Sequence, residues 1–349
     1  MKKMKNKIFT FCILLIAQLG FSQIPDGYYD SADGLVGDDL REALMNIIDG
    51  HDTQTYGSLW THFQVTDAKT NDTVWDMYSD VPGGESDYYF TFVTDQCGNY
   101  GAEGDCYNRE HSFPKSWFGG QTPPMYTDLF HIVATDGYVN GQRGNYPYGE
   151  VDNASWTSSN GSKKGANTYP GYVGTVFEPI DEYKGDFARN YFYMLTRYMD
   201  LLDGWDSDML EDDNFSDWAK NLLLDWSNAD TISVKEIDRN NEIYGIQENR
   251  NPFIDHPEYA QAIWDLSASI NIEKLSPATA FYNYSTIYLG DFEGKFDLVR
   301  LYSISGKMIF ESSLEGEKAS FFINLTNGMY ILDFNGEGGR STLKLVVSN

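Results

Sequence analysis

The pattern of apolar residues changes near Ser276-Pro277, and this change divides the chain into two regions that need different folds. After it, short runs with alternating apolar residues are separated by turn sequences such as Ser305-Gly306 and Asn327-Gly328. Alternation with a period of two is typical of strands that bury one face. We therefore predict that residues 277–349 form a small all-β sandwich. Its predicted strands are 298–303, 307–311, 320–325, 329–334 and 342–347.

The earlier region, 24–276, combines helical patterns with aromatic-rich irregular sequence, and we predict an α+β domain with several helices. Apolar residues recur at helical spacing in the predicted helices, and Ser216 is of a type preferred at the N-cap. The predictions are helices over 38–50, 185–202 and 257–267, a helix that begins after Ser216, strands over 72–78 and 88–93, and polar irregular sequence over 239–257.

Residues 1–23 have the organisation of a secretory signal peptide. Four lysines within the first seven residues form a basic start, and an apolar run over 8–19 follows. That run is too short to span a bilayer, so we predict an exported chain with no membrane span in its mature form. An uncleaved anchor or a short buried helix is the alternative.

Removal of this segment leaves two cysteines, Cys97 and Cys106. An even pair in an exported chain is typical of a disulfide, whereas two free buried thiols are the alternative. The bridge would lie directly before the sequence Arg109-Glu110-His111 and would stiffen the chain there. Closing a loop of this size contributes about 2–3 kcal/mol to stability.

Two short runs carry the chemistry. The first places the carboxylate of Glu110 beside the imidazole of His111, and the second places the amide of Asn140 three residues before the guanidinium of Arg143. Hydrolysis of a phosphodiester needs a base for water, a site for a hard cation and a positive group for phosphate. The two runs supply all three, which predicts a metal-dependent nuclease.

The acidity of the chain opposes this prediction, because nucleic-acid binders usually present a basic face. The formal net charge is −27. Acidic residues are concentrated away from the candidate site, however: 106–148 carries three basic and three acidic residues, whereas 200–217 carries eight acidic residues and no basic one. The acidic segment is interpreted as a solvated loop, with Ca²⁺ binding as the alternative, since it lacks the regular ligand spacing of a calcium loop.

With these residues in view, the region from about 40 to 268 resembles the bacterial endonuclease I family, which implies a ββα-metal (His-Me finger) fold. Four ordered motifs carry the resemblance. They are Asn108-Arg109-Glu110-His111 with Pro114-Lys115-Ser116, Asp128-Leu129-Phe130-His131 leading to Asn140-Gly141-Gln142-Arg143-Gly144-Asn145, Gly185-Asp186-Phe187-Ala188-Arg189, and Asn249-Arg250-Asn251-Pro252-Phe253.

The resemblance implies roles for particular residues. His111 would be the general base, and Glu110 and Asn140 would hold one Mg²⁺, with Ca²⁺ or Mn²⁺ as alternatives. Arg143 would clamp the phosphate, a structural salt bridge being the other interpretation. Arg189 and Arg250 would bind backbone phosphates.

Arg189 and His131, both within the matching motifs, each have an alternative interpretation. Arg189 would otherwise pair with Asp186 or Asp181 on its own predicted helix. Relatives show two adjacent histidines where this chain has Phe130-His131, which puts a catalytic role for His131 in doubt and favours a packed core residue.

Residues from about 277 to 349 look like the C-terminal sorting domain of the type IX secretion system, which implies that machinery as a partner. The matching runs are Tyr302-Ser303-Ile304-Ser305-Gly306-Lys307, Leu325-Thr326-Asn327-Gly328-Met329-Tyr330 and Lys344-Leu345-Val346-Val347. The chain is thus predicted to be a secreted or cell-surface endonuclease that hydrolyses DNA without sequence specificity, with RNA as a further substrate. The alternative is an exported adhesin or Ca²⁺-binding surface protein that keeps the fold and lacks the chemistry.

Overall fold

The computed structural model describes residues 24–265, 279–283, 285–290, 296–303, 307–314, 319–336 and 339–347. The predicted signal peptide and the predicted domain boundary at 276 lie outside these residues. The chain divides into two compact units, Met1–Ala260 and Gln261–Asn349, and each is considered by itself. None of the described helices has the length and apolar character needed to cross a membrane.

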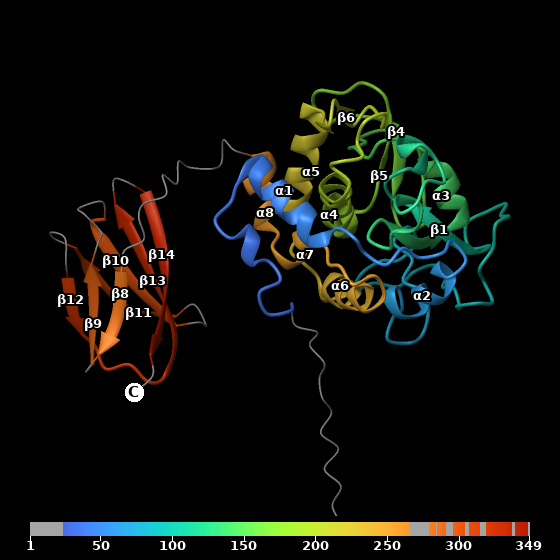
Figure 1. Ribbon diagram of the computed structural model, residues 1–349. Helices are drawn as coiled ribbons and strands as arrows, with labels where there is room; N and C mark the ends of the chain where they lie inside the picture. The colour runs from blue at the N-terminus through green and yellow to red at the C-terminus, as the bar shows by residue number, and fades with distance from the viewer. Residues whose placement is uncertain are drawn as a thin grey trace, which may run out of the picture. The chain divides into compact units, whose positions relative to one another are not determined.

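Helices and small antiparallel sheets make up the N-terminal unit (Figure 1). Its helices are α1 (Gly37–Ile48), α2 (Leu59–Thr66), α3 (Gly137–Arg143), α4 (Asp181–Arg197), α5 (Asp217–Ala229), α6 (Val234–Gln247), α7 (Pro252–Asp255) and α8 (Glu258–Trp264), with the 3₁₀ turns η1 (Asp30–Ala32), η2 (Lys115–Phe118) and η3 (Met125–Thr127). Its strands are β1 (Tyr107–His111), β2 (Ile132–Asp136), β3 (Ala154–Thr157), β4 (Lys163–Ala166), β5 (Thr175–Glu178), β6 (Leu210–Glu211) and β7 (Asn214–Phe215). They form the pair β1–β2, the sheet β3–β4–β5 and the pair β6–β7.

Helix α4 runs through the middle of this unit, and α1, α5 and α7 pack against it (Figure 1). Every α4 residue from Tyr183 to Arg197 is buried. Burial of large apolar side chains such as Phe187 and Phe192 stabilises the unit by about 1.5–3 kcal/mol each. The charged residues of α4 are buried too, so each needs partners from neighbouring elements.

Strands β1 and β2 and helix α3 form a compact ββα unit. The strands pair antiparallel, with Tyr107 opposite Asp136 and His111 opposite Ile132. Asp136 ends β2 and is also the N-cap of α3, where its Oδ1 accepts a hydrogen bond from the backbone N–H of Val139 at 2.9 Å. The helix therefore begins directly at the end of the strand and packs back against both strands.

The predicted disulfide is present between Cys97 and Cys106. The backbone N–H of Cys97 donates to the carbonyl of Tyr107 at 3.1 Å, and the N–H of Tyr107 donates to the carbonyl of Asp95 at 3.0 Å. The bridge and these two bonds attach the preceding loop to the start of β1, as the position of the cysteines in the sequence indicates.

The predicted helices are confirmed with shifted ends. Those predicted over 38–50 and 257–267 correspond to α1 and α8, and the one predicted over 185–202 is α4, which begins and ends earlier. Ser216 is the N-cap of α5, although its Oγ donates to the carbonyl of Asp208 and does not cap the helix.

The prediction that 239–257 is irregular is wrong, because α6 covers its first half. This helix buries Glu236, Arg239, Asn240, Ile243 and Gln247, and four of these five residues are polar. An apolar repeat is therefore missing from the sequence. The helix start did carry a signal, a capping box in which Ser233 and Glu236 bond to each other's backbone N–H.

The strands predicted over 72–78 and 88–93 are also wrong. The structure gives these segments isolated β-bridges in place of a ladder. Asp76 accepts hydrogen bonds from the backbone N–H of Tyr78 and the hydroxyl of Ser79, and this side-chain turn breaks the extended chain. The β-branched and aromatic residues of these segments contribute to the core without forming a sheet.

The C-terminal unit contains two antiparallel sheets, as predicted. Its strands are β8 (Thr279–Asn283), β9 (Thr286–Gly290), β10 (Leu298–Ser303), β11 (Met308–Ser313), β12 (Ala319–Phe322), β13 (Gly328–Gly336) and β14 (Gly339–Val347). One sheet has the order β11–β10–β13–β14 and the other β12–β9–β8. Ile287 of β9 shares a core with Val299 and Leu301 of β10, so the two sheets form a sandwich. The sequence pattern missed β8 and β9.

Replacing both Cys97 and Cys106 with serine should lower the free energy of unfolding by about 2–3 kcal/mol, because the bridge restricts the unfolded chain. Urea unfolding followed by tryptophan fluorescence measures the change. Reduced wild-type protein should match the variant. Equal stability of oxidised and reduced protein would contradict the expectation.

Candidate active site

The candidate site is built around β1, whose successive side chains point to opposite faces. Asn108 and Glu110 share one face, and Arg109 and His111 share the other. The first face meets α3, where Asn140 contacts Asn108. The second faces the loops before α2 and around η3. The end of β1 therefore places the carboxylate and the imidazole on opposite faces of the strand.

Glu110 is buried, with 3% of its surface exposed. Its Oε1 accepts a hydrogen bond from the hydroxyl of Tyr78 at 2.9 Å and lies 3.1 Å from Nη1 of Arg143. Burial raises the pKa of Glu110 to about 7, although Arg143 and Tyr78 act in the opposite direction. Both of these side-chain partners contact Oε1.

Arg143 lies inside the protein, with 1% of its surface exposed. Besides Glu110, its guanidinium donates to the carbonyl of His111 at 3.0 Å, to the carbonyl of Ser112, and to the hydroxyl of Tyr191 at 3.1 Å. This placement argues against the phosphate clamp expected from the sequence and agrees with the alternative, a structural salt bridge. The arginine joins α3, the end of β1 and α4.

Asn140 lies on α3 one turn before Arg143 and is partly exposed. Its Nδ2 donates to Oδ1 of Asn108 at 2.8 Å. With the amide nitrogen held by Asn108, the Oδ1 of Asn140 is left to accept or to bind a cation. Asn108 thus orients the amide that the sequence analysis selected as a ligand.

The imidazole of His111 lies in a near-parallel stack with the rings of Tyr126 and Tyr56, at centroid distances of 5.2 and 6.1 Å. Its Nε2 is 3.1 Å from the carbonyl oxygen of Tyr126. Burial, with contributions from His131 and Lys115, lowers the pKa of His111 to about 3. The ring is therefore uncharged near neutral pH.

His131 is fully buried and its Nε2 is 2.7 Å from the carbonyl oxygen of Met125. Nearby, the carboxylate of Asp128 accepts hydrogen bonds from the hydroxyls of Tyr193 and Tyr198 at 2.8 and 2.6 Å. These contacts favour the interpretation of His131 as a core residue. The motif that contains Asp128 and His131 fastens η3 and β2 to α4.

Arg189, predicted to bind phosphate, is fully buried among acidic residues. Its guanidinium lies 2.8 Å from Asp230 and 3.5 Å from Asp186, and it also pairs with Glu236. The alternative pairing with Asp186 is thus the one that the structure contains. Placement among three carboxylates argues against phosphate binding.

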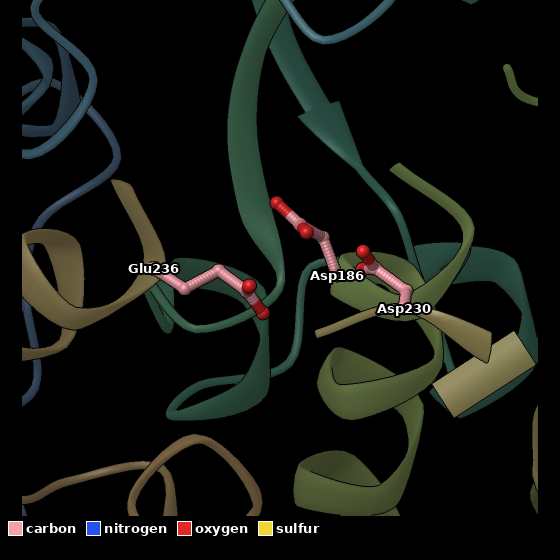
Figure 2. A group of neighbouring side chains, drawn as sticks. All are labelled: Asp186, Asp230 and Glu236. Atoms are coloured by element: carbon pink, nitrogen blue, oxygen red, sulfur yellow. The ribbon is translucent and has the colours of Figure 1, made fainter. Parts of the chain in front are cut away.

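Figure 2 shows the same three carboxylates, Asp186, Asp230 and Glu236, whose oxygens lie within 4.8 Å of one another. Such a cluster could hold a metal ion. Two side-chain cations already occupy it, however, because Lys235 lies 2.8 Å from Asp186 and Arg189 contacts all three acids. The acidic charge is therefore largely neutralised by the chain itself.

Arg250, the other predicted phosphate ligand, forms an internal ion pair with Asp255 at 2.6 Å and is 1% exposed. Its Nη2 also donates to Oδ1 of Asn241 at 2.9 Å. As for Arg189, this placement argues against a role in phosphate binding. The arginine instead ties the segment before α7 to α6.

Residues 36–258 match the family model described as Endonuclease I. The chain belongs to the endonuclease I family. It is 36% identical over 249 residues to the extracellular ribonuclease of Bacillus subtilis (strain 168), covering 68% of this chain and 78% of that protein. The extracellular ribonuclease of Bacillus amyloliquefaciens is 37% identical over 253 residues, with the same coverage. Endonuclease-1 of Buchnera aphidicola subsp. Baizongia pistaciae is 29% identical over 128 residues, 37% of this chain and 46% of that protein.

Residues 267–348 of this endonuclease I family member match the model described as a secretion system C-terminal sorting domain. The protein is therefore a nuclease that is secreted or held at the cell surface, as predicted. Family membership over most of the N-terminal unit favours the enzyme over the alternative of a non-catalytic adhesin or Ca²⁺-binding surface protein.

Sequence analysis missed Tyr78 and Tyr126, which position Glu110 and His111. Tyr126 lies two residues before Asp128, so closeness to a motif was a usable signal. Tyr78 carried none, because its contact with Glu110 spans 32 residues and depends on the fold.

The burial of Arg143 predicts that Arg143→Gln lowers the free energy of unfolding by about 3–5 kcal/mol, since Glu110 and two carbonyls lose their partner. Arg143→Lys should lie between this variant and wild type. Urea unfolding measures both. If Arg143 were a phosphate clamp, Arg143→Gln would instead raise KM for nucleic acid and leave the unfolding midpoint unchanged. That result would contradict the structural role.

The occupied acidic cluster predicts that Glu236→Gln lowers stability but leaves the Mg²⁺ concentration for half-maximal cleavage unchanged. Glu110→Gln should raise that concentration or abolish cleavage, because it would remove the carboxylate that the sequence predicts as a ligand. A Mg²⁺ titration of activity compares the two glutamine variants. A change in metal requirement confined to Glu236→Gln would place the metal in the cluster.

Proposed function

We propose that this secreted nuclease is a metal-dependent endonuclease that hydrolyses DNA without sequence specificity and also cleaves RNA. The observation that carries the proposal is the ββα unit, in which β1 carries Glu110 and His111 and the adjoining helix α3 carries Asn140. The match to the endonuclease I family and the ββα unit that carries these residues both support our proposal that the site is a His-Me finger.

His111 is the proposed general base, and its hydrogen bond selects the atom that acts. A backbone carbonyl only accepts hydrogen bonds, so the Nε2 that faces the Tyr126 carbonyl carries the proton. The lone pair is then on Nδ1. Because burial lowers the pKa of His111, the imidazole is neutral near pH 7 and its Nδ1 lone pair is unprotonated.

The residues beside this base fit a hard divalent cation. The proposed ligands are the Oε2 of Glu110 and the Oδ1 of Asn140, both oxygens of the kind that Mg²⁺ prefers. Ca²⁺ and Mn²⁺ would accept the same set. When bound, the cation would stabilise negative charge on the phosphate and on the leaving oxygen. Tyr78, Arg143 and Asn108 hold the two ligands in position.

The proposed step has a simple balance. A water molecule gives a proton to Nδ1 of His111 while its oxygen forms a bond to phosphorus. The bond between phosphorus and the leaving oxygen breaks, and that oxygen takes the electron pair and then a proton from solvent. His111 returns its proton to solvent and regains the neutral form.

Supercoiled plasmid should be nicked by the mature chain with Mg²⁺, and EDTA should abolish nicking. His111→Ala should lower the rate by about a hundred- to ten-thousandfold, because the base is lost. His256→Ala is the matched control: this histidine pairs with Glu258 at 3.1 Å, on the segment between α7 and α8. Nicking that survives EDTA, or that His111→Ala leaves unaltered, would contradict the mechanism.

The same four reactions on single-stranded RNA test the second substrate. Two relatives are called extracellular ribonucleases, which favours RNA cleavage by this chain as well. Cleavage of RNA alone would restrict the proposal to one sugar type and would leave the chemistry of His111 unchanged.

A further inference from the structure

The proposed nuclease needs cations that reach its substrate, and the arginines expected to provide them point inward. Arg143, Arg189 and Arg250 are each at most 1% exposed and are paired internally. Two other basic residues, Arg109 and Lys115, flank the candidate base in the same stretch of sequence, and both are partly exposed. Both also act on the imidazole of His111, since their charges lower its pKa.

We propose that Arg109 and Lys115 bind the backbone phosphates on either side of the scissile bond, and that Tyr56 and Trp60 hold the Arg109 guanidinium in place. This inference rests on the proposed function and names the residues that bind its substrate.

Arg109 shares a face of β1 with His111, and its guanidinium lies between two aromatic rings. Its Cζ is 3.6 Å from the ring centroid of Tyr56 and 4.2 Å from that of Trp60. Nη1 donates to the carbonyl of Tyr56 at 2.6 Å. Stacking on both faces restricts the guanidinium to one plane, so little conformational freedom remains to be lost when an anion binds.

The guanidinium keeps donors that the chain does not use. Within residues 24–265, the buried Nε of Arg109 has no hydrogen-bond partner, and no acceptor is found for Nη2. Because Nε is enclosed by the protein, Nη2 is the donor of the fixed guanidinium that is left for a phosphate oxygen.

Lys115 reaches the site from the other side of His111. It begins η2, and its Nζ lies 5.7 Å from the ring centroid of Tyr126, the ring that stacks on the imidazole. Of the carboxylates in the described part of the chain, none forms an ion pair with Lys115 or with Arg109. Each of these two cations can therefore form an ion pair with an anion that binds to the protein.

The charge of the whole chain makes these two cations more significant. In a protein of net charge −27, most of the surface repels a polyanion. The nearest acidic group on β1, Glu110, is already paired with Arg143. Uncompensated positive charge beside His111 then directs the nucleic-acid backbone to the base, and it does so without reading the sequence.

Binding measured without cleavage tests the proposal. The probe is a fluorescein-labelled single-stranded DNA of about 12 nucleotides, and its Kd for the full chain is measured by anisotropy in EDTA at several salt concentrations. Lys115→Gln and Arg109→Gln should each weaken binding about five- to tenfold and reduce the slope of log Kd against log salt by about one. Lys220→Gln is the matched control for charge, because Lys220 pairs with an exposed residue, Asp217, on α5.

The aromatic sandwich is tested by a double-variant cycle. Tyr56→Leu should weaken binding in the wild-type background and have little effect in the Arg109→Gln background, because its contribution acts through the guanidinium. Circular dichroism confirms folding of each variant. If Arg109→Gln does not fold, Lys115→Gln still decides the matter, since its side chain is partly exposed and lies outside the sandwich.

Equal Kd values and salt slopes for Lys115→Gln, Arg109→Gln and Lys220→Gln would overturn the proposal. Failure of the proposed function is separate: a wild-type chain that binds the probe but never cleaves plasmid or RNA would refute the activity alone. A chain that cleaves normally, with Lys115→Gln binding like the control, would refute only the phosphate contacts.

Discussion

The buried guanidinium of Arg143 is the interaction on which the candidate site depends. A charge inside a protein is tolerated only when a counter-charge and hydrogen bonds offset its desolvation. Glu110 supplies the counter-charge, and the carbonyls of His111 and Ser112 and the hydroxyl of Tyr191 supply acceptors. One side chain therefore fixes where β1 ends relative to α3 and α4. The proposed base and metal ligands follow from that geometry.

The same logic extends through the N-terminal unit, whose interior is polar as well as aromatic. Asp128, fully buried, accepts hydrogen bonds from the hydroxyls of Tyr193 in α4 and Tyr198 directly after it, and Arg189 is held by three carboxylates. Such networks are favourable only when every member is satisfied, so they specify one arrangement of the helices. Motif residues far from the candidate base thus contribute by fixing the positions of the helices. A residue that belongs to a motif shared with nucleases therefore need not lie in the active site.

The sequence was informative where a residue's role depends on its neighbours along the chain. Helical spacing located α1, α4 and α8, alternation located most strands of the sandwich, and a cysteine pair located the disulfide. It was uninformative where the role depends on distant partners. The buried face of α6 is mostly polar, so the sequence shows no apolar repeat that would predict this helix. Arg250 was predicted to bind phosphate because its partners, Asp255 and Asn241, can be identified only in the folded chain. The proposal that Nδ1 of His111 is the acting atom likewise depends on the carbonyl of Tyr126.

The two faces of β1 explain how an acidic chain can present a site for a polyanion. On one face, the negative charge of Glu110 is matched by Arg143 inside the protein. On the other face, Arg109 is positive, partly exposed and held by aromatic rings that cannot neutralise it. Because alternation along a strand separates neighbouring residues, acid and base next to each other in sequence need not cancel in space. Net charge therefore constrains the rest of the surface more than it constrains the end of β1.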